Sequence, residues 1–143
     1  MIATSPSNSV TPAVPPNGKS PWTVGGQDVP FTVQVSQPDP GDNPAAVIRV
    51  EKIGGPVLAV CGQVDTLWES CPYAQAIMSR LDAKGFAHPH ELYAYPQAGH
   101  YVDLLLPYQP RRADLFANGV SPQADEVARI DVWPKVIHAI TTS

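Results

Sequence analysis

An unbroken apolar run between two glycines is the feature that most constrains the fold of this chain. Every residue of Pro56–Cys61 (PVLAVC) is apolar, and Gly55 and Gly62 bound the run. A strand that is apolar on both faces suits a parallel sheet covered on both sides, whereas a strand with one solvated face alternates apolar and polar residues. The run therefore predicts a buried strand of a parallel sheet.

A helix and a second strand are predicted to follow. Ser70 or Cys71 is expected to cap the helix, with Pro72 in its first turn and Gly85 as its left-handed stop. Apolar residues at helical spacing predict the buried stripe of this helix: Tyr73, Ile77, Met78 and Leu81. Glu91–Tyr95 (ELYAY) predicts the second strand. Because a strand, a helix and a strand in this order form a right-handed crossover, the predicted fold class is α/β with a parallel sheet.

The C-terminal end of the chain predicts another helix, over Gln123–Ile140. Its apolar residues at helical spacing are expected to form the buried stripe: Val127, Ile130, Trp133, Ile137 and Ile140. Pro134 must kink this segment or begin a second helix there, because proline has no N–H to donate within a helix.

Composition changes along the chain and divides it into two parts. Residues 1–44 are expected to be a loop-rich excursion with a short strand at Met1–Thr4 and an edge hairpin or extended excursion over Trp22–Val35. Residues 45–143 carry the α/β segment. Two or three strands do not complete a parallel sheet, so we expect that N-terminal strands are missing or that another chain supplies them.

Charge and cysteine content narrow the class of protein. The formal net charge of -4 and the pI near 5.4 argue against nucleic acid or an anionic membrane surface as a partner. No apolar run is long enough to span a bilayer, and Met1–Val10 lacks the regions of a secretory leader, so we expect a cytoplasmic protein. Cys61 and Cys71 lack the spacing of a zinc or redox site, and we expect two reduced thiols rather than a disulfide.

Two residues that could carry chemistry follow the two predicted strands. In open α/β sheets, reactive groups lie in the loops just past the carboxyl ends of strands, and Asp65 and His100 hold such positions. A hydrolytic triad needs these residue types in the chain order nucleophile, acid, histidine. His100 would take the proton of the nucleophile, and Asp65 would fix its tautomer and stabilise the imidazolium. A turn aspartate and an ordinary histidine remain the alternative interpretation.

Three segments within Ile48–His100 carry a resemblance to a known family: IRVEKIGGPVLAVCGQVDTLWES, YAQAIMSRL and HELYAYPQAGH. This block closely resembles the C-terminal catalytic domain shared by acyl-CoA thioesterases and bile acid-CoA:amino acid N-acyltransferase, a branch of the dienelactone-hydrolase-like α/β-hydrolases. The resemblance implies the C-terminal portion of an α/β-hydrolase fold with an incomplete sheet. For the complete enzyme it implies an acyl-CoA or other acyl (thio)ester as substrate, and either hydrolysis of that bond or transfer of the acyl group to an amine.

The same resemblance assigns roles to individual residues. It implies that Asp65 is the triad acid and His100 the triad base. Gly62 and Gly99 are expected to shape the two loops that present them. Behind the acid, Trp68 and Ser70 match the family's pattern and are interpreted as packing and helix-capping residues.

One catalytic motif of the family is absent from these 143 residues. Members of this family carry Ser or Cys in a G-x-[SC]-x-G nucleophile elbow, and the 143 residues contain no such pentapeptide. The opening MIATSPSNSV looks like the segment just after the elbow helix, so the chain is expected to begin downstream of the nucleophile and the oxyanion donors. An acid and a base without these groups should contribute little catalysis. Neither Ser70 nor Cys71 is expected to replace the nucleophile, and Ser5, Ser7 and Ser20 are predicted to be solvated loop serines.

Several alternatives stay open. Four residues could act as metal ligands: His88, His90, Glu91 and His100. Because they form no compact ligand set, we expect a solvated histidine pair, no metal ion and no cofactor. Arg111 and Arg112 could meet the phosphates of coenzyme A.

The alternative function is a non-catalytic binding or oligomerisation module that associates through an exposed sheet edge. A third possibility is a decayed chain that does not fold.

Overall fold

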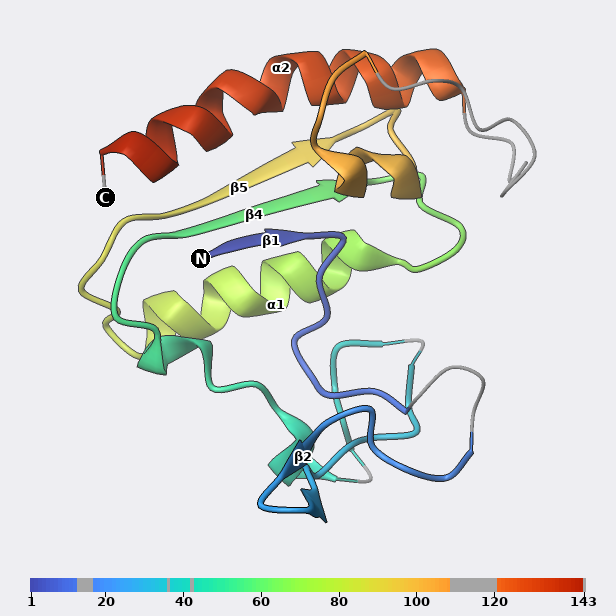
Figure 1. Ribbon diagram of the computed structural model, residues 1–143, viewed down its shortest axis with the longest axis vertical. Coiled ribbons are helices and arrows are strands. Elements are labelled where there is room, and N and C mark those ends of the chain that lie inside the picture. Colours follow the sequence, from blue (N-terminus) through green and yellow to red (C-terminus); the bar gives the residue numbers. More distant parts are fainter. Residues whose placement is uncertain (13–16, 36, 42, 109–120, 143) are drawn as a thin grey trace.

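A three-stranded parallel sheet lies at the centre of the fold, in the order β1 (Ile2–Thr4), β4 (Val57–Gly62) and β5 (His90–Tyr95). Helix α1 (Ser70–Ala83) covers one face of the sheet and helix α2 (Pro122–Thr141) covers the other (Figure 1). This computed structural model describes residues 1–12, 17–35, 37–41, 43–108 and 121–142. The predicted α/β class, with parallel strands joined by a crossover helix, is confirmed.

Both faces of the central strand β4 are buried, which explains why its sequence is apolar without alternation. Leu58 and Val60 pack into the core on the α2 side, whereas Ala59 and Cys61 pack on the α1 side. All residues of the strand are buried. Fully burying a Val or Leu side chain contributes about 1.5–3 kcal/mol relative to leaving it exposed, so the two faces together anchor both helices to the sheet.

Helix α1 packs and ends as its sequence predicts. Tyr73, Ile77 and Leu81 are buried, and Met78 is partly buried against the same core. Gly85 follows the helix with a φ of 59°, the left-handed conformation that a residue without Cβ adopts at little cost. The predicted stripe and the predicted stop are therefore confirmed.

Helix α2 turns a different face to the core from the one predicted. Ala128, Val132 and Val136 are buried, whereas Val127 and Ile130 are 66% and 43% exposed. Ile137 and Ile140 are also exposed, and Trp133 is only partly buried, so the predicted stripe is wrong. The helix continues through Pro134, which rules out a second helix beginning there. Among the described residues, no helix is both long and apolar enough to cross a membrane.

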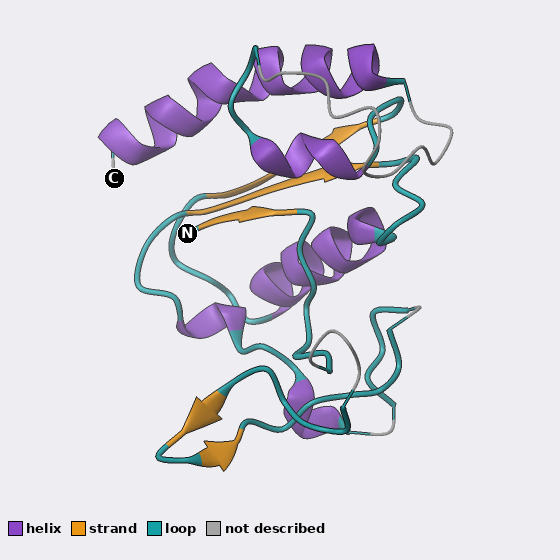
Figure 2. Cartoon of the chain, turned by 45° about the vertical axis from the view of Figure 1, so that its right-hand side comes forward, coloured by secondary structure: helices purple, strands orange, loops and turns teal. Residues whose placement is uncertain are grey.

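The segment between β1 and β4 lies apart from the three-stranded sheet (Figure 2). It contains a hairpin, formed by β2 (Thr23–Val24) and β3 (Gln27–Asp28), which pair antiparallel in a sheet of their own. The hairpin covers only part of Trp22–Val35 and does not lie on an edge of the three-stranded sheet, so that expectation holds only in part. Gly25 and Gly26 connect β2 and β3 with φ values of 58° and 79°, as a tight hairpin turn requires. Two short 3-10 helices lead back to the sheet, η1 (Pro44–Ala46) and η2 (Val50–Lys52). The division of the chain at residue 44 stays a prediction.

Cys61 and Cys71 form a disulfide, so the expectation of two reduced thiols is wrong. The loop after β4 folds back and places the first turn of α1 against the end of the strand. The two Cα atoms are therefore 5.2 Å apart, within the range that a disulfide spans. Spacing along the sequence does not reveal this approach, because it depends on the path of the intervening loop.

Candidate functional site

The two predicted site residues come together at the carboxyl ends of neighbouring strands. Strands β4 and β5 end at the same level, since Gly62 pairs with Tyr95. Asp65 lies in the loop after β4, and His100 begins the short helix η3 (His100–Leu104) after β5, which lies beside the tips of both strands (Figure 1). Parallel pairing in this register therefore brings the two loops side by side.

Asp65 and His100 are hydrogen-bonded to each other. His100 Nδ1 lies 2.9 Å from Asp65 Oδ2. The Asp65 side chain is fully buried, and the His100 side chain is 24% exposed. One ring nitrogen is thus held by a buried carboxylate, which orients the imidazole and leaves Nε2 as the nitrogen that Asp65 does not engage.

Three further donors hold the Asp65 carboxylate. Its Oδ1 accepts from the backbone N–H groups of Leu67 and Trp68 at 3.1 and 2.9 Å, and its Oδ2 accepts from Ser70 Oγ at 3.0 Å. Burial acts to raise the pKa of Asp65, but the hydrogen bonds from His100, Trp68 and Ser70 outweigh it, so the pKa lies below its ordinary value. Asp65 is therefore fully ionised at neutral pH despite its burial.

The electrostatics of His100 complement those of Asp65. The hydrogen bond to Asp65 raises the pKa of His100, and it outweighs burial, which acts in the opposite direction. The negative charges of Asp65, Asp103 and Asp125 add to the increase. The site thus favours a positively charged imidazole, the species that forms whenever His100 accepts a proton.

Ser70 differs from its expected role. It is the first residue of α1 rather than its cap, and the residue at the cap position, Glu69, makes no side-chain capping bond. Ser70 Oγ instead donates to Asp65, so the start of the helix helps to hold the acid. Trp68 packs as expected, stacked on Tyr73 with ring centroids 5.0 Å apart.

Gly62 lets the acid loop and the histidine loop approach each other. A Cβ at this position would lie 2.3 Å from the carbonyl oxygens of both Ala98 and Gly99. Gly99 has a φ of -104° and a ψ of -149°, and its expected role in presenting His100 stays a prediction. The close approach explains how side chains from two strands reach one hydrogen bond.

Helix α2 contributes two contacts that sequence reasoning missed. Asp125 Oδ1 accepts from the backbone N–H of Gly99 at 2.6 Å, and Arg129 Nη1 donates to the carbonyl of Tyr101 at 3.0 Å. Both side chains are buried. They clamp the segment on either side of His100. Their spacing of four residues on one helix face was the available signal, but nothing in the pattern showed that a charged face turns inward.

Ser5 makes a third missed contact, because it is not the solvated loop serine that the sequence predicts. It directly follows β1, is half-buried, and donates from Oγ to the backbone carbonyl of His100 at 3.3 Å. Its φ of 40° is unusual for a residue other than glycine. The carboxyl end of β1 therefore lies directly beside the histidine loop.

Asp103 lies on the other side of the imidazole. Its Oδ2 is 3.7 Å from His100 Nε2, and its Oδ1 is buried without a hydrogen-bond partner among the described residues. Burial raises the pKa of Asp103, although the positive charge of His100 acts to lower it. A carboxylate therefore lies beside each of the two ring nitrogens: Asp65 beside Nδ1 and Asp103 beside Nε2.

Of the remaining candidates from the sequence, His90, Ser70 and Cys71 are each bonded to a neighbouring group. His90 is bonded to Asp82 through Nε2 and to the carbonyl of His88 through Nδ1, and no group of three or more potential ligands among the described residues could hold a metal ion. Ser70 is bonded to Asp65, and Cys71 has no free thiol. Arg111 and Arg112 lie outside the described residues.

Comparison with known proteins supplies the context of the site. The family model described as BAAT / acyl-CoA thioester hydrolase C terminal matches residues 7–141. The peroxisomal succinyl-coenzyme A thioesterase of Mus musculus is 35% identical over 102 residues, which are 67% of this chain and 24% of that protein. The human acyl-coenzyme A thioesterase 6 is 33% identical over 109 residues, 71% of this chain and 25% of that protein. The human mitochondrial acyl-coenzyme A thioesterase 2 is 33% identical over 110 residues, 71% of this chain and 22% of that protein. The chain spans about a quarter of the length of these curated relatives.

Proposed function

The chain belongs to the family of C-terminal domains of acyl-CoA thioester hydrolases and the related BAAT enzymes, and on this premise we propose that it supplies the acid and the base of a Ser/Cys-His-Asp triad. The bond cleaved is an acyl-CoA thioester or a related acyl (thio)ester. The hydrogen bond of 2.9 Å between His100 Nδ1 and Asp65 Oδ2 is the observation that carries this proposal.

The roles of the two residues follow from that geometry. Asp65 accepts the Nδ1–H of His100, so the lone pair of the neutral ring is on Nε2. Nε2 takes the proton of the attacking hydroxyl or thiol, and the imidazolium then returns it to the leaving group. Asp65 stays ionised throughout because its pKa is lowered, and it stabilises the imidazolium without taking the proton.

The nucleophile and the oxyanion donors come, in this proposal, from polypeptide outside residues 1–143, because the sequence has no G-x-[SC]-x-G elbow. The open edge of the sheet offers a place for it. Among the described residues, β1 pairs only with β4, so its other edge has unpaired backbone groups. Since Ser5 at the end of β1 contacts His100, a further parallel strand on this edge would end close to His100. The chain by itself is then expected to show little hydrolytic activity.

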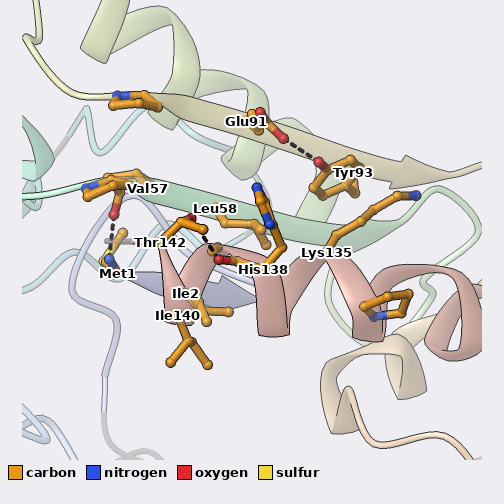
Figure 3. A pocket seen from close by; sticks show the side chains of 14 residues that line it. Met1, Ile2, Val57, Leu58, Glu91, Tyr93, Lys135, His138, Ile140 and Thr142 are labelled. Atoms are coloured by element: carbon orange, nitrogen blue, oxygen red, sulfur yellow. Dashed lines mark hydrogen bonds between the residues drawn. The ribbon is translucent and has the colours of Figure 1, made fainter.

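A cavity of about 630 Å³ adjoins the same edge at the opposite end of the strands. Its walls are formed by β1, β4, β5 and the C-terminal half of α2, and Figure 3 shows Ile2, Leu58 and Ile140 among the lining side chains. An apolar surface beside an unpaired strand favours contact with more polypeptide. This observation also supports the second candidate function, a non-catalytic module that associates through the β1 edge, either with itself or with another chain.

One experiment separates the two functions. The chain is mixed with a purified segment that carries the nucleophile elbow, and the complex is treated with an active-site phosphonate that labels an activated Ser or Cys. Triad function predicts labelling that is lost in His100→Ala and Asp65→Asn but kept in Asp82→Asn, which removes only the carboxylate bonded to His90. A well-folded complex whose labelling is indifferent to His100 would refute the triad.

Sedimentation of the chain alone tests the second function. Self-association that persists in His100→Ala would support an interaction module, and a strictly monomeric folded chain would count against it.

The proposal also includes a cytoplasmic location and membership of the dienelactone-hydrolase-like branch. The relatives include a peroxisomal and a mitochondrial protein. Subcellular fractionation with an antibody against residues 123–142 tests the location.

A further inference from the structure

Asp103 is placed by the first turn of η3. The helix begins at His100, so the side chain three residues later returns to the same side of the turn and faces the imidazole. The distance of 3.7 Å between His100 Nε2 and Asp103 Oδ2 is that of an ion pair rather than a hydrogen bond. Nε2 is the atom that a nucleophile must reach, and it already has a carboxylate beside it.

The other charged groups around His100 do not substitute for Asp103. Asp65 holds Nδ1 from the loop after β4. Asp125, on α2, is bonded to the backbone N–H of Gly99. Arg129, also on α2, is bonded to Glu126 and to the carbonyl of Tyr101. Within the part of the chain that the structure describes, Asp103 is therefore the carboxylate that faces the Nε2 side of the ring.

The backbone N–H of Leu104 and the charge of Arg129 also act on the Asp103 carboxylate, but one of its oxygens lacks a partner in the described part of the chain. Its Oδ1 is buried and accepts no hydrogen bond from the described residues. A buried carboxylate oxygen without a donor is costly, so the carboxylate gains from any nearby positive charge. A protonated His100 provides that charge at Oδ2.

We propose that Asp103 is a positioning residue that holds the imidazolium form of His100 from its Nε2 side and competes for Nε2 with the hydroxyl or thiol of the nucleophile. This inference rests on the proposed function for its catalytic meaning, because Nε2 matters only if His100 is the base. The pairing of Asp103 with His100 does not depend on the proposed function. A neutral His100 releases Asp103 and is free to accept the proton of the nucleophile.

The consequence for the enzyme is a particular dependence on pH. Two carboxylates on one imidazole favour the protonated ring, and a general base works only when it is unprotonated. The acid limb of the pH–rate profile therefore lies at a higher pH than Asp65 alone would set. Removing the charge of Asp103 moves that limb to lower pH.

NMR titration of the imidazole tests the pairing in the chain itself, without any activity. Histidine labelled with ¹⁵N is followed in the wild type and in Asp103→Asn, which keeps the size of the side chain and removes its charge. The His100 midpoint is expected to fall by roughly half a pH unit or more in the variant. The matched control is Asp82→Asn, which should move the midpoint of His90 and leave that of His100 unchanged.

A measurement on the wild type covers the case in which Asp103→Asn does not fold. The ¹³C resonance of the Asp103 carboxyl should show a second step at the midpoint of His100, because the two groups titrate together. The absence of this step, or an unchanged His100 midpoint in a folded Asp103→Asn protein, would overturn the inference. Asp65→Asn separates the two proposals: if it lowers the His100 midpoint while Asp103→Asn does not, the inference fails and the pair behind the proposed triad remains.

Discussion

Replacing Gly62 with alanine should push apart the two loops that hold Asp65 and His100. The added Cβ would lie 2.3 Å from the carbonyl oxygens of Ala98 and Gly99 and 2.6 Å from the carbonyl carbon of Ala98. All three are backbone atoms, which cannot rotate away as the end of a side chain can. Relief of the overlap therefore requires the histidine loop to move.

The free energy that this movement costs can be estimated from the known effect of overpacking. Overpacking a well-filled site costs about 1–3 kcal/mol and sometimes more. With two backbone carbonyls as obstacles, we expect about 3 kcal/mol for Gly62→Ala, a large part of the total stability of a small domain. The hydrogen bond between His100 and Asp65 should weaken at the same time, because the loop that moves carries His100.

The assay is urea unfolding combined with NMR of the His100 ring. Gly54→Ala is the matched control, because a Cβ at Gly54 meets no atom within 4 Å. The control should stay within about 0.5 kcal/mol of the wild type or gain slightly from the reduced freedom of its unfolded chain. Equal stability of Gly62→Ala and Gly54→Ala, with an unchanged His100 resonance, would refute the close approach of the loops.

Three other predictions follow from the same contacts. Reducing the disulfide between β4 and α1, which joins residues 10 apart, should lower the unfolding free energy by about 2–3 kcal/mol in urea titrations with and without reductant. Asp65 titrates below its ordinary 3.8 and His100 above its ordinary 6.5, so their pairing stabilises the fold above the first value and below the second. The stability difference between the wild type and Asp65→Asn should therefore be largest between those two pH values and shrink as pH falls through the Asp65 pKa or rises through the His100 pKa. On α2, Val132→Ala should cost about 1–3 kcal/mol, whereas Ile130→Ser should cost under about 0.5 kcal/mol in thermal or urea melts of the chain.

The sequence predicts the elements of the sheet because their signal is local. The apolar run of β4 needs a strand covered on both sides, and the structure covers it with α1 and α2. Gly85 needs a left-handed turn, and the helix ends there. The positions of Asp65 and His100 just past two neighbouring strands follow from the order of the elements, so their meeting could be expected from the sequence.

The buried face of α2 could not be predicted, because the helix carries two apolar stripes. The stripe at Val127 and Ile130 is as apolar as the buried one. The buried face also carries Asp125 and Arg129, which bind the backbone on either side of His100. A count of apolar residues does not detect these polar contacts.

Contacts between distant parts of the chain were missed for a related reason. The disulfide depends on how the loop between Cys61 and Cys71 folds back, and the contact of Ser5 depends on β1 lying beside β4. Neither leaves a local pattern in the sequence. Both hold segments next to Asp65 and His100, so the surroundings of the site were harder to predict than its two central residues.

The most direct test of the central claim is the rate of acyl-CoA cleavage by a protein in which this chain is joined to a nucleophile-bearing segment. Release of coenzyme A is measured for the wild type, His100→Ala, Asp65→Asn and the control Asp82→Asn. A loss in kcat of about 10³-fold or more is expected for each of the first two variants, with an unchanged rate for the control. A folded His100→Ala protein that retains its rate within a few-fold would show that the base lies elsewhere.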